Sequence, residues 1–452
     1  MKFFRIKPAL IYSLLAFSGC AWMGNPKVPK LDIPAQFRST SPSYTSVENL
    51  PYLAWWQSLH DPELNSLIET GLLNNLDIDI ALSNLEQAKG QLKQIQLSWI
   101  PFVNIYAGFS SNPAFGNPGT FFGIWPQYVL NIPKLIKQQK QAKYNVEIAR
   151  AMIDSVKLTL IGQISAGYLT LIAEQEQLRL FQRLKNDLNE LITLEINLIE
   201  IGLKDTIHVA QFIVTEKQIQ AQINLVQNNI VLSQNTLRYL LNQNPGTIKN
   251  SDNFAALDLS VFKPGSLPST VLKNRPDLLV AENSLKSSYT GVSVAYGSLF
   301  PAIQLDNFLG MSSGQGTLAA PSHQGTMRDA YLNWGINPST FGQIEAQKGA
   351  YQATVYQYIQ TVRKILKDVD NSFSANMQFS QNYKHTYSAW ETQKNKYDLQ
   401  QGLYQSGLMS YSELLISKID LDNLALVLNQ SKLQFSMTVV SLYQELAGGY
   451  KS

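Results

Sequence analysis

The chain repeats itself, and this internal duplication limits the possible fold more than any other feature. Residues 72–109 and 272–309 align without a gap, and the segment 201–214 corresponds to 406–419. Copies of about 200 residues are too long to be solenoid repeats, so the duplication concerns a whole structural unit. The residues identical in both copies include Leu72/Leu272, Asn74/Asn274, Asp77/Asp277, Ala81/Ala281, Leu85/Leu285, Ser98/Ser298 and Pro101/Pro301.

Each copy is predicted to begin with an amphipathic helix, at roughly 62–99 and 270–299. Both helices are expected to end before a proline, Pro101 or Pro301, because the residue before a proline disfavours the helical conformation. We predict a first structural repeat over 62–266 and a second over 267–452. The fold class expected is α+β.

Alternating apolar and polar residues after each proline predict a β-hairpin, at about 101–133 and about 301–338. Two interpretations fit the alternation. Strands of about ten residues with one apolar face, one polar face and aromatic ends are typical of a transmembrane β-barrel. A half-buried hairpin in a domain outside the membrane would alternate in the same way. The apolar face of the two first strands carries Val103, Ile105, Ala107 and Phe109, and Ile303, Leu305 and Leu309.

Two long tracts, 134–244 and 339–452, contain no proline. A helix over 134–200 would be about 100 Å long, which no small core can cover, so such helices must pack side by side as in coiled coils. Gly202 and Gly407 lie inside these tracts, and glycine tolerates the φ values that end a helix. We therefore predict two helical hairpins with tips at these glycines. A glycine tolerated within one continuous helix is the alternative.

The N-terminus resembles a bacterial lipoprotein signal. Basic residues precede an apolar run of about a dozen residues, which is too short to span a bilayer and ends at "FSGC". On this interpretation residues 1–19 are removed, and Cys20 carries palmitate or similar acyl chains at the start of a lipid-anchored, extended segment over 20–61. A free thiol is the alternative. No later run approaches about 18 apolar residues, so entry into a membrane is expected through strands.

Composition argues against several functions. The net charge of +3 is too small for a nucleic-acid-binding field. The four histidines, His60, His208, His323 and His385, show no metal-ligand spacing, and Cys20 is the single cysteine. No phosphate loop or hydrolase motif occurs, and Asp420 and Asp422 read as solvated helix charges. We predict no enzymatic activity, no metal and no cofactor beyond the covalent lipid on Cys20.

Several segments together resemble the TolC-like outer-membrane efflux proteins, in particular their lipid-anchored, NodT-type branch. The likeness covers nearly the whole chain after Cys20. The segments that carry it are "WWQSLHDPELNSLIE" (55–69), "LPSTVLKNRPDLLVAENSL" (267–285), "GVSVAYGSLFPAIQL" (291–305), "YQSGLMSYSELLISKIDL" (404–421) and "SLYQELAGGY" (441–450).

This resemblance implies a homotrimer in the bacterial outer membrane that extends into the periplasm. Three copies with four strands each would close a β-barrel of about twelve strands, and the long helices would form a hollow α-barrel. A periplasmic adaptor would dock at the tips near Gly202 and Gly407, and an inner-membrane RND-type pump would supply energy. The expected function is a passive exit duct for drugs or other small molecules.

The resemblance also points to an entrance at the helix tips. Relatives often carry an aspartate six residues after the tip glycine and a second one nine after it. Here Glu413 and Ile416 hold these positions in the second copy, and His208 holds the first of them in the first copy. We expect an entrance that is less acidic than in relatives and partly closed by apolar contact at Ile416. A solvated helix charge is the alternative for Glu413.

Two other functions remain open at this point. The same fold could serve as the outer-membrane conduit of a type I protein secretion system. A structural coiled-coil lipoprotein without a channel is the third possibility, and it would require the hairpins to lie outside the membrane.

Overall fold

The computed structural model describes residues 28–39, 45–46, 50–110, 119–202, 206–251, 254–259, 264–265, 268–312, 324–335 and 337–451. These residues form two compact units. The first contains Leu82–Met152 and Asp277–Thr361, and the second contains Asp32–Ala81, Ile153–Pro276 and Val362–Ser452. Each sequence repeat contributes to both units. The repeats are therefore halves of an interleaved fold and not separate domains.

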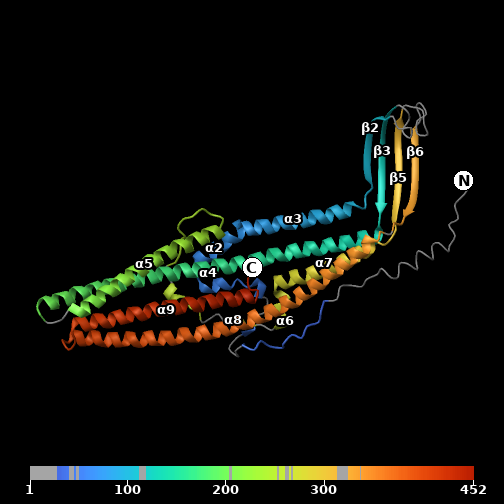
Figure 1. The fold of residues 1–452 in the computed structure, drawn as a ribbon. Helices are drawn as coiled ribbons and strands as arrows, with labels where there is room; N and C mark the ends of the chain where they lie inside the picture. The colour runs from blue at the N-terminus through green and yellow to red at the C-terminus, as the bar shows by residue number, and fades with distance from the viewer. Residues whose placement is uncertain are drawn as a thin grey trace. The chain divides into compact units, whose positions relative to one another are not determined.

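The first unit holds a four-stranded antiparallel sheet in the order β2-β3-β5-β6 (Figure 1). The strands are β2 (Phe102–Ser110), β3 (Gly119–Leu130), β5 (Ala302–Ser312) and β6 (Gln324–Asn333). Each repeat supplies one hairpin, and β3 pairs with β5 to join them. The predicted α+β class is confirmed, and the two predicted hairpins form one sheet of four strands.

The register of the sheet places apolar residues opposite one another across strands. Ile105 pairs with Ile124, and on the same face Tyr128 pairs with Leu305, which pairs with Ala330, so this largely apolar face runs across both hairpins. Ile105 is 70% exposed and Phe109 65% exposed. Because neighbouring side chains alternate between the two faces of a strand, this exposure marks a whole apolar face without cover from the described part of the chain.

The helices that precede the strands are each divided, whereas one continuous helix was predicted. α2 (Pro62–Asn74) is followed by α3 (Leu76–Leu97), and α6 (Pro268–Asn274) by α7 (Pro276–Gly297). Asn75 separates the first pair because its Oδ1 accepts hydrogen bonds from the N–H groups of Asp77 and Ile78 and caps α3. Pro276 separates the second pair.

Two quasi-equivalent contacts join the strands to the turns that follow α3 and α7. Tyr128 Oη donates to the Trp99 carbonyl at 2.7 Å, and Trp334 Nε1 donates to the Leu299 carbonyl at 3.1 Å. Each aromatic side chain holds the end of its strand beside the turn of its own repeat.

A third contact at this end of the helices crosses between repeats. Asn131 Oδ1 accepts from Lys134 N and caps α4. Its Nδ2 donates to the carbonyls of Gly297 and Phe300 at 3.0 Å each. The first repeat is therefore tied to the second just where the sheet meets the helices.

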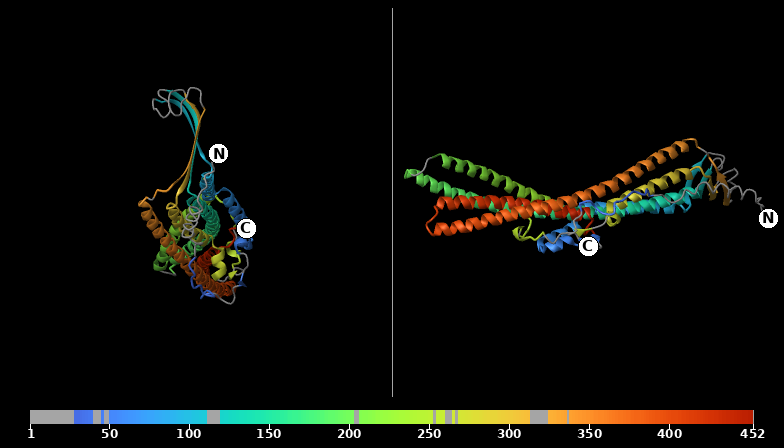
Figure 2. Two further views of the ribbon diagram at one scale, coloured as in Figure 1. Left: turned by 90° about the vertical axis from the view of Figure 1, so that its right-hand side faces the viewer. Right: turned by 90° about the horizontal axis from the view of Figure 1, so that it is seen from below.

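The second unit contains two long helical hairpins. α4 (Ile132–Glu200) pairs with α5 (Thr206–Leu240), and α8 (Ser339–Gln405) pairs with α9 (Tyr411–Glu445); the chain reverses direction within each pair (Figures 1 and 2). α4 and α8 each begin in the first unit and end in the second. Leu184, Leu188, Ile219 and Ile223 form one buried cluster between α4 and α5.

One expectation about apolar runs is wrong. α4 includes an 18-residue window that is apolar enough to cross a membrane by composition alone, although no such run was expected after Cys20. In the structure 61% of that window is buried inside the protein. Long core helices have the same composition, so this window gives no reason to place α4 in a lipid bilayer.

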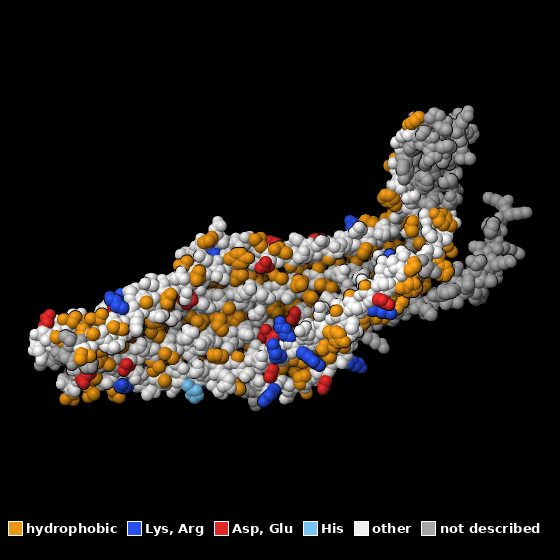
Figure 3. All heavy atoms as spheres, in the orientation of Figure 1, with side chains coloured by type: hydrophobic (Ala, Val, Ile, Leu, Met, Phe, Trp, Pro, Cys, Tyr) orange, Lys and Arg blue, Asp and Glu red, His pale blue; other side chains and the backbone are white. Residues whose placement is uncertain are grey.

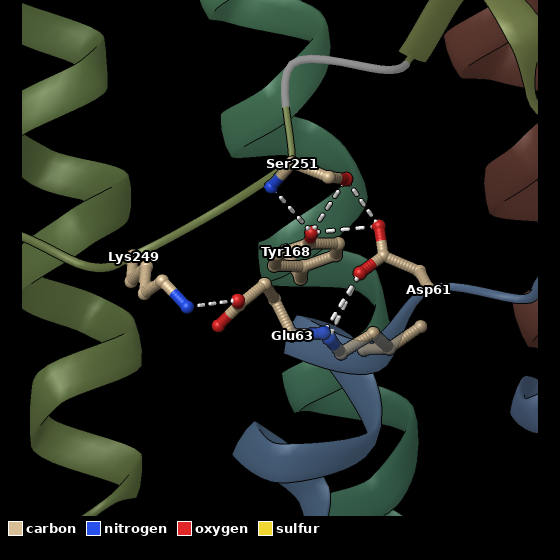
Figure 4. A network of polar contacts seen from close by, with 6 residues as sticks. Asp61, Glu63, Tyr168, Lys249 and Ser251 are labelled. Carbon is tan, nitrogen blue, oxygen red and sulfur yellow. Dashed lines mark hydrogen bonds and ion pairs between the residues drawn. The ribbon is translucent and has the colours of Figure 1, made fainter.

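A polar network fixes the segment before α2 against α4 in the second unit (Figure 4). Asp61 Oδ1 caps α2 by accepting from Glu63 N at 3.0 Å, and its Oδ2 accepts from Tyr168 Oη at 2.7 Å. Ser251 Oγ donates to the same oxygen, and Lys249 pairs with Glu63. Burial raises the pKa of Tyr168, so this phenol remains a neutral donor. One aspartate thereby joins three chain segments.

Short elements complete the second unit. β1 (Thr45–Ser46) pairs in parallel with β4 (Pro264–Gly265), and 3-10 helices occur at Leu50–Tyr52, Trp55–Leu59 and Phe254–Ala256. Trp55 stacks on Tyr443 with ring centroids 4.9 Å apart. The 3-10 helix Trp55–Leu59 is therefore packed against the last turns of α9.

Candidate functional site

The turn between α8 and α9 is built around Gly407. This residue has a φ of 74°, and its N–H donates to the Tyr404 carbonyl while Leu408 N donates to the Leu403 carbonyl, both at 2.9 Å. This pair of bonds is a Schellman motif, which ends a helix at a residue in the left-handed region. Gly202 has a φ of 76° after α4, and its N–H donates to the Ile199 carbonyl at 2.9 Å. Both glycines thus lie where a helix ends.

Glu413 caps the helix that follows this turn. Ser410 N and Ser410 Oγ lie 3.0 and 2.7 Å from Glu413 Oε2, and Glu413 N donates to Ser410 Oγ at 3.3 Å. This reciprocal arrangement is a capping box, which satisfies backbone donors at the start of α9. The carboxylate is exposed, but its geometry already gives it a structural role.

Of the other predicted entrance residues, the structure describes the side chain of Ile416 but not that of His208. Ile416 lies in the second turn of α9 and is 40% exposed. His208 lies in the first turn of α5, but its side chain is outside the described residues, as is the whole of Cys20. Ile201 and Leu408, which adjoin the two tip glycines, are 68% and 76% exposed. An apolar side chain therefore stands beside each tip glycine.

A ladder of polar contacts joins α4 of the first repeat to α9 of the second, near these tips. Arg183 pairs with Asp422 at 2.6 Å, and Lys418 pairs with Asp187 at 2.7 Å. Closer to the turns, Tyr411 Oη donates to Glu190 at 2.5 Å, and Ser412 Oγ donates to Glu195. The four contacts connect helices that belong to different hairpins, so they resist separation of the hairpin ends.

Three of the four carboxylates of this ladder are buried, and Glu190 is exposed. Asp187, Asp422 and Glu195 are 5%, 2% and 1% exposed. Burial, together with the hydrogen bond that the protonated Asp422 carboxyl donates to Asp187, raises the pKa of Asp422 to about 6, although the Arg183 guanidinium acts in the opposite sense. Burial disfavours the charged form of Lys418, but the Asp187 carboxylate outweighs it and raises the pKa of Lys418. The hydrogen bond to Glu190 raises the pKa of Tyr411 to about 12.

The interpretation of Asp422 as a solvated charge is wrong. Asp420 is exposed, but Asp422 faces α4 and binds Arg183. The sequence did hold a signal, because Arg183/Asp187 and Lys418/Asp422 are two opposite-charge pairs four residues apart. Such spacing is usually read as a contact within one helix. Here each cation binds the carboxylate of the other helix.

Among the described residues no group of three or more His, Cys, Asp or Glu side chains could hold a metal ion. Hydrophobic side chains form scattered patches on the helical surface that Figure 3 shows, among a larger area of polar side chains and backbone, and charged side chains cover less of it.

Comparisons with known proteins agree with this geometry. The family model described as "Outer membrane efflux protein" matches residues 67–243 and 267–448, one segment in each repeat. The probable efflux pump outer membrane protein TtgC of Pseudomonas putida is 24% identical, covering 98% of this chain and 96% of its own. The probable outer membrane lipoprotein SilC of Salmonella typhimurium is 23% identical, covering 99% of each chain.

A solved structure has the same fold. The CmeC outer membrane channel of Campylobacter jejuni superimposes with a TM-score of 0.79 at 19% identity, covering 95% of each chain. At this identity the likeness concerns the fold, and that fold includes both the sheet and the helical hairpins described above.

Proposed function

Because the chain belongs to the outer membrane efflux protein family, we propose that it is the exit duct of a tripartite efflux system in the bacterial outer membrane. On this proposal it passes drugs or other small molecules outward without catalysis, and an inner-membrane RND-type pump supplies the energy. A periplasmic adaptor connects the two at the helix tips. The apolar side chains beside Gly202 and Gly407 suit such a contact, since exposed apolar patches often mark binding surfaces.

The observation that carries this proposal is the four-stranded sheet. One of its faces is apolar and exposed, and its outer strands β2 and β6 each have a single neighbour in the described part of the chain. In lipid every backbone polar group needs a partner, so such a sheet must close on itself. Four strands are too few, and three copies would supply about twelve, which lies within the range of known barrels.

The polar ladder supports a second element of the proposal, a closed entrance. In a duct the α4 and α8 hairpins would surround the path, and contacts between α4 and α9 would hold their ends together. Buried ion pairs are costly to break by removal of one partner. The ladder residues Arg183, Asp187, Lys418 and Asp422 are therefore proposed to keep the resting entrance narrow.

Anchoring through acylated Cys20 is part of the proposal. The relative SilC is named a probable outer membrane lipoprotein, and this chain has the lipobox-like "FSGC". Two or three acyl chains would give a durable anchor. Labelling with a palmitate analogue tests this point, because a Cys20→Ser variant should lose the label.

Single-channel conductance of the purified protein in planar bilayers tests the duct. We expect small, long-lived openings in the wild type and larger ones when Glu413 and Ile416 are both replaced by glycine. If a folded trimer stayed silent with both substitutions, the structural coiled-coil lipoprotein would become the better interpretation. Export of small dyes, but not of a secreted protein, from cells that lack their own duct would favour efflux over type I secretion.

A further inference from the structure

Lysines gather where the helices of the first unit adjoin its sheet (Figure 1). The twelve helical residues nearest the sheet on α3, α4, α7 and α8 carry eight lysines, two glutamates and no arginine or aspartate. Their formal charge of +6 exceeds the +3 of the whole chain, so all other residues together carry −3. The positive charge of this protein is therefore concentrated beside the sheet. The four segments are 86–97, 132–143, 286–297 and 339–350.

Half of these lysines belong to the first turns of α4, and three of them form what we call the basic patch: Lys137, Lys140 and Lys143. Lys137 and Lys140 are half-buried, and Lys143 is exposed. Among the described residues, neither Lys137 nor Lys143 forms an ion pair with a carboxylate. The next acid along α4, Glu147, binds Arg150 through both oxygens at 2.9 and 3.0 Å. Two of the three cations therefore have no carboxylate in the described part of the chain to neutralise them.

Two members of the basic patch repel each other. Burial and the nearby charge of Lys140 both lower the pKa of Lys137. An opposite charge within about 4–6 Å favours the protonated form of a lysine, whereas a like charge disfavours it. A bound anion would therefore relieve this repulsion, and a cationic or neutral ligand would not. The chemistry of the patch favours an anionic partner.

The basic patch lies on a face of α4 that α7 does not cover. α7 contacts α4 through Asn145, whose Oδ1 accepts from Ser287 Oγ at 2.7 Å. At about 100° per residue, Lys140 and Lys143 lie about 140° and about 160° around the helix from Asn145. Ile136, one turn before Lys140 on the same face, is 52% exposed. An exposed apolar side chain next to the sheet is thus followed by lysines, the order expected where a segment leaves a membrane.

The membrane surface that the proposed function implies passes close to these lysines. Tyr128 lies near the end of β3 and Trp334 just after β6, and aromatic side chains mark both interfaces of a transmembrane barrel. At about 1.5 Å per residue, Lys137 lies about 8 Å and Lys143 about 17 Å along α4 from Ile132. The potential of an anionic lipid surface falls off within a Debye length of about 8–10 Å. The basic patch therefore lies within about one to two Debye lengths of the lipid headgroups, with Lys137 nearest to them.

We propose that the basic patch binds the phosphate groups of anionic phospholipids in the inner leaflet of the outer membrane and so sets the depth at which the sheet crosses the bilayer. This inference rests on the proposed function, which places the sheet in that membrane. Each lysine near an anionic surface strengthens binding about fivefold. Three copies would present three patches around the periplasmic end of the barrel. A free anion, or an anionic molecule inside the duct, would meet the same charges, and either would contradict the proposal.

Trp fluorescence in reconstituted vesicles tests the proposal. The purified full chain is placed in equal mixtures of phosphatidylglycerol and phosphatidylethanolamine, in which one of the two lipids carries brominated acyl chains that quench nearby Trp. The relative quenching by the two lipids gives the preference for the anionic one. We expect the wild type to prefer phosphatidylglycerol at least about fivefold in 0.1 M salt. The preference should fall below about twofold in 1 M salt, where the Debye length shortens from about 10 to about 3 Å.

Two triple variants with the same change in net charge locate the effect. Replacing all three lysines of the basic patch by glutamine should remove the preference, and replacing them by arginine should keep it. The matched control replaces Lys364, Lys384 and Lys396 by glutamine, because these exposed lysines lie about 38 Å or more along α8 from Ser339. This control should keep the wild-type preference. No preference in the wild type, or one that survives in the glutamine variant of the patch, would overturn the proposal.

Two further measurements identify other partners of the patch. In vesicles of phosphatidylethanolamine alone, millimolar inorganic phosphate should leave the midpoint of thermal unfolding unchanged. A rise that the glutamine variant of the patch lacks would show binding of free phosphate and contradict the proposal. Single-channel reversal potentials report the duct. If the glutamine variant shifts them but keeps the lipid preference, the lysines line the conducting path and the proposal is wrong.

The same vesicles separate the failure of this proposal from that of the proposed function. A wild type that conducts but shows no lipid preference would overturn the lipid contact and leave the duct in place. A wild type that neither inserts nor conducts with either lipid would contradict both.

Discussion

Lys418 Nζ lies 2.7 Å from Asp187 Oδ1, and this ion pair joins α9 of the second repeat to α4 of the first. The neighbouring pair, Arg183 and Asp422, spans the same two helices one turn away. Two cations and two carboxylates are thus arranged so that both ion pairs cross between hairpins. Any movement that separates the hairpin ends must first break these pairs.

Replacing Lys418 by methionine should loosen this connection. Asp187 is 5% exposed and would lose its cation beside another buried carboxylate. Breaking a fully buried ion pair lowers the free energy of unfolding by about 3–5 kcal/mol. Because the Lys418 side chain is 36% exposed, we expect a smaller loss of about 1–2 kcal/mol here. The measurement is single-channel conductance, which should rise in Lys418→Met and stay near wild type in Lys418→Arg. Identical conductance in all three proteins would contradict a role in closure.

Stability near the tips should depend on Asp422 between about pH 7 and about pH 4. Its pKa in the folded protein, about 6, lies above the ordinary value of 3.8, so the folded state binds this proton more tightly than the unfolded state does. The contribution of Asp422 therefore favours folding as the pH falls and is lost as the pH rises through 6. Arg179, Arg183, Asp187 and Lys418 are the charged groups around it.

Thermal unfolding or hydrogen exchange of the α9 amides at several pH values checks this prediction. Asp422→Asn should flatten the part of the pH dependence centred near 6 and leave other transitions in place. If the stability of the wild type does not change with pH in this range, Asp422 does not titrate there. The same conclusion follows if Asp422→Asn shows the same pH dependence as the wild type.

Two substitutions at Glu413 separate its charge from its capping role. Glutamine can complete a capping box, whereas alanine cannot. We expect Glu413→Gln to resemble the wild type in both stability and ion selectivity, and Glu413→Ala to destabilise the start of α9 by about 1 kcal/mol. Protection of the first α9 amides from hydrogen exchange reports the cap, and reversal potentials report selectivity. If Glu413→Gln changes the ion selectivity, the charge of Glu413 acts at the entrance, and its role is not limited to the cap.

At Ile416 the expected change is one of selectivity. This side chain is 40% exposed, so an aspartate can be accommodated without burying a charge. In a trimer, Ile416→Asp would place three carboxylates around the entrance, and rings of acidic side chains favour cations. Reversal potentials in a salt gradient should shift toward cation selectivity, whereas Ile416→Asn should leave them unchanged. Equal reversal potentials in the three proteins would place Ile416 away from the conducting path.

The strands, the long helices and the duplication could be predicted because each has a local cause. Alternation sets the faces of β2, and the absence of proline from 134 to 200 and from 339 to 405 permits α4 and α8 to run without interruption. The break at Asn75 was missed, since an asparagine in a helical pattern becomes a cap only when its side chain turns back to the next N–H groups. The role of Asp422 was predicted wrongly because its partner Arg183 lies on another helix. Which helices pack together cannot be deduced from the spacing of charges along one helix.

Asn131 offers a test of how the two repeats are held together. Its side chain caps α4 and also binds the carbonyls of Gly297 and Phe300 across the repeat boundary. Asn337 holds a comparable place before α8, where its Oδ1 accepts from Ser339 N at 3.0 Å. Asn131→Ala should therefore cost about 2 kcal/mol, from a lost cap and two lost hydrogen bonds, and Asn337→Ala about 1 kcal/mol from the cap. The midpoint of denaturant unfolding, measured by Trp fluorescence, should fall further for the first variant. Equal midpoints would mean that the bridge to Gly297 and Phe300 adds nothing to the stability of the first unit.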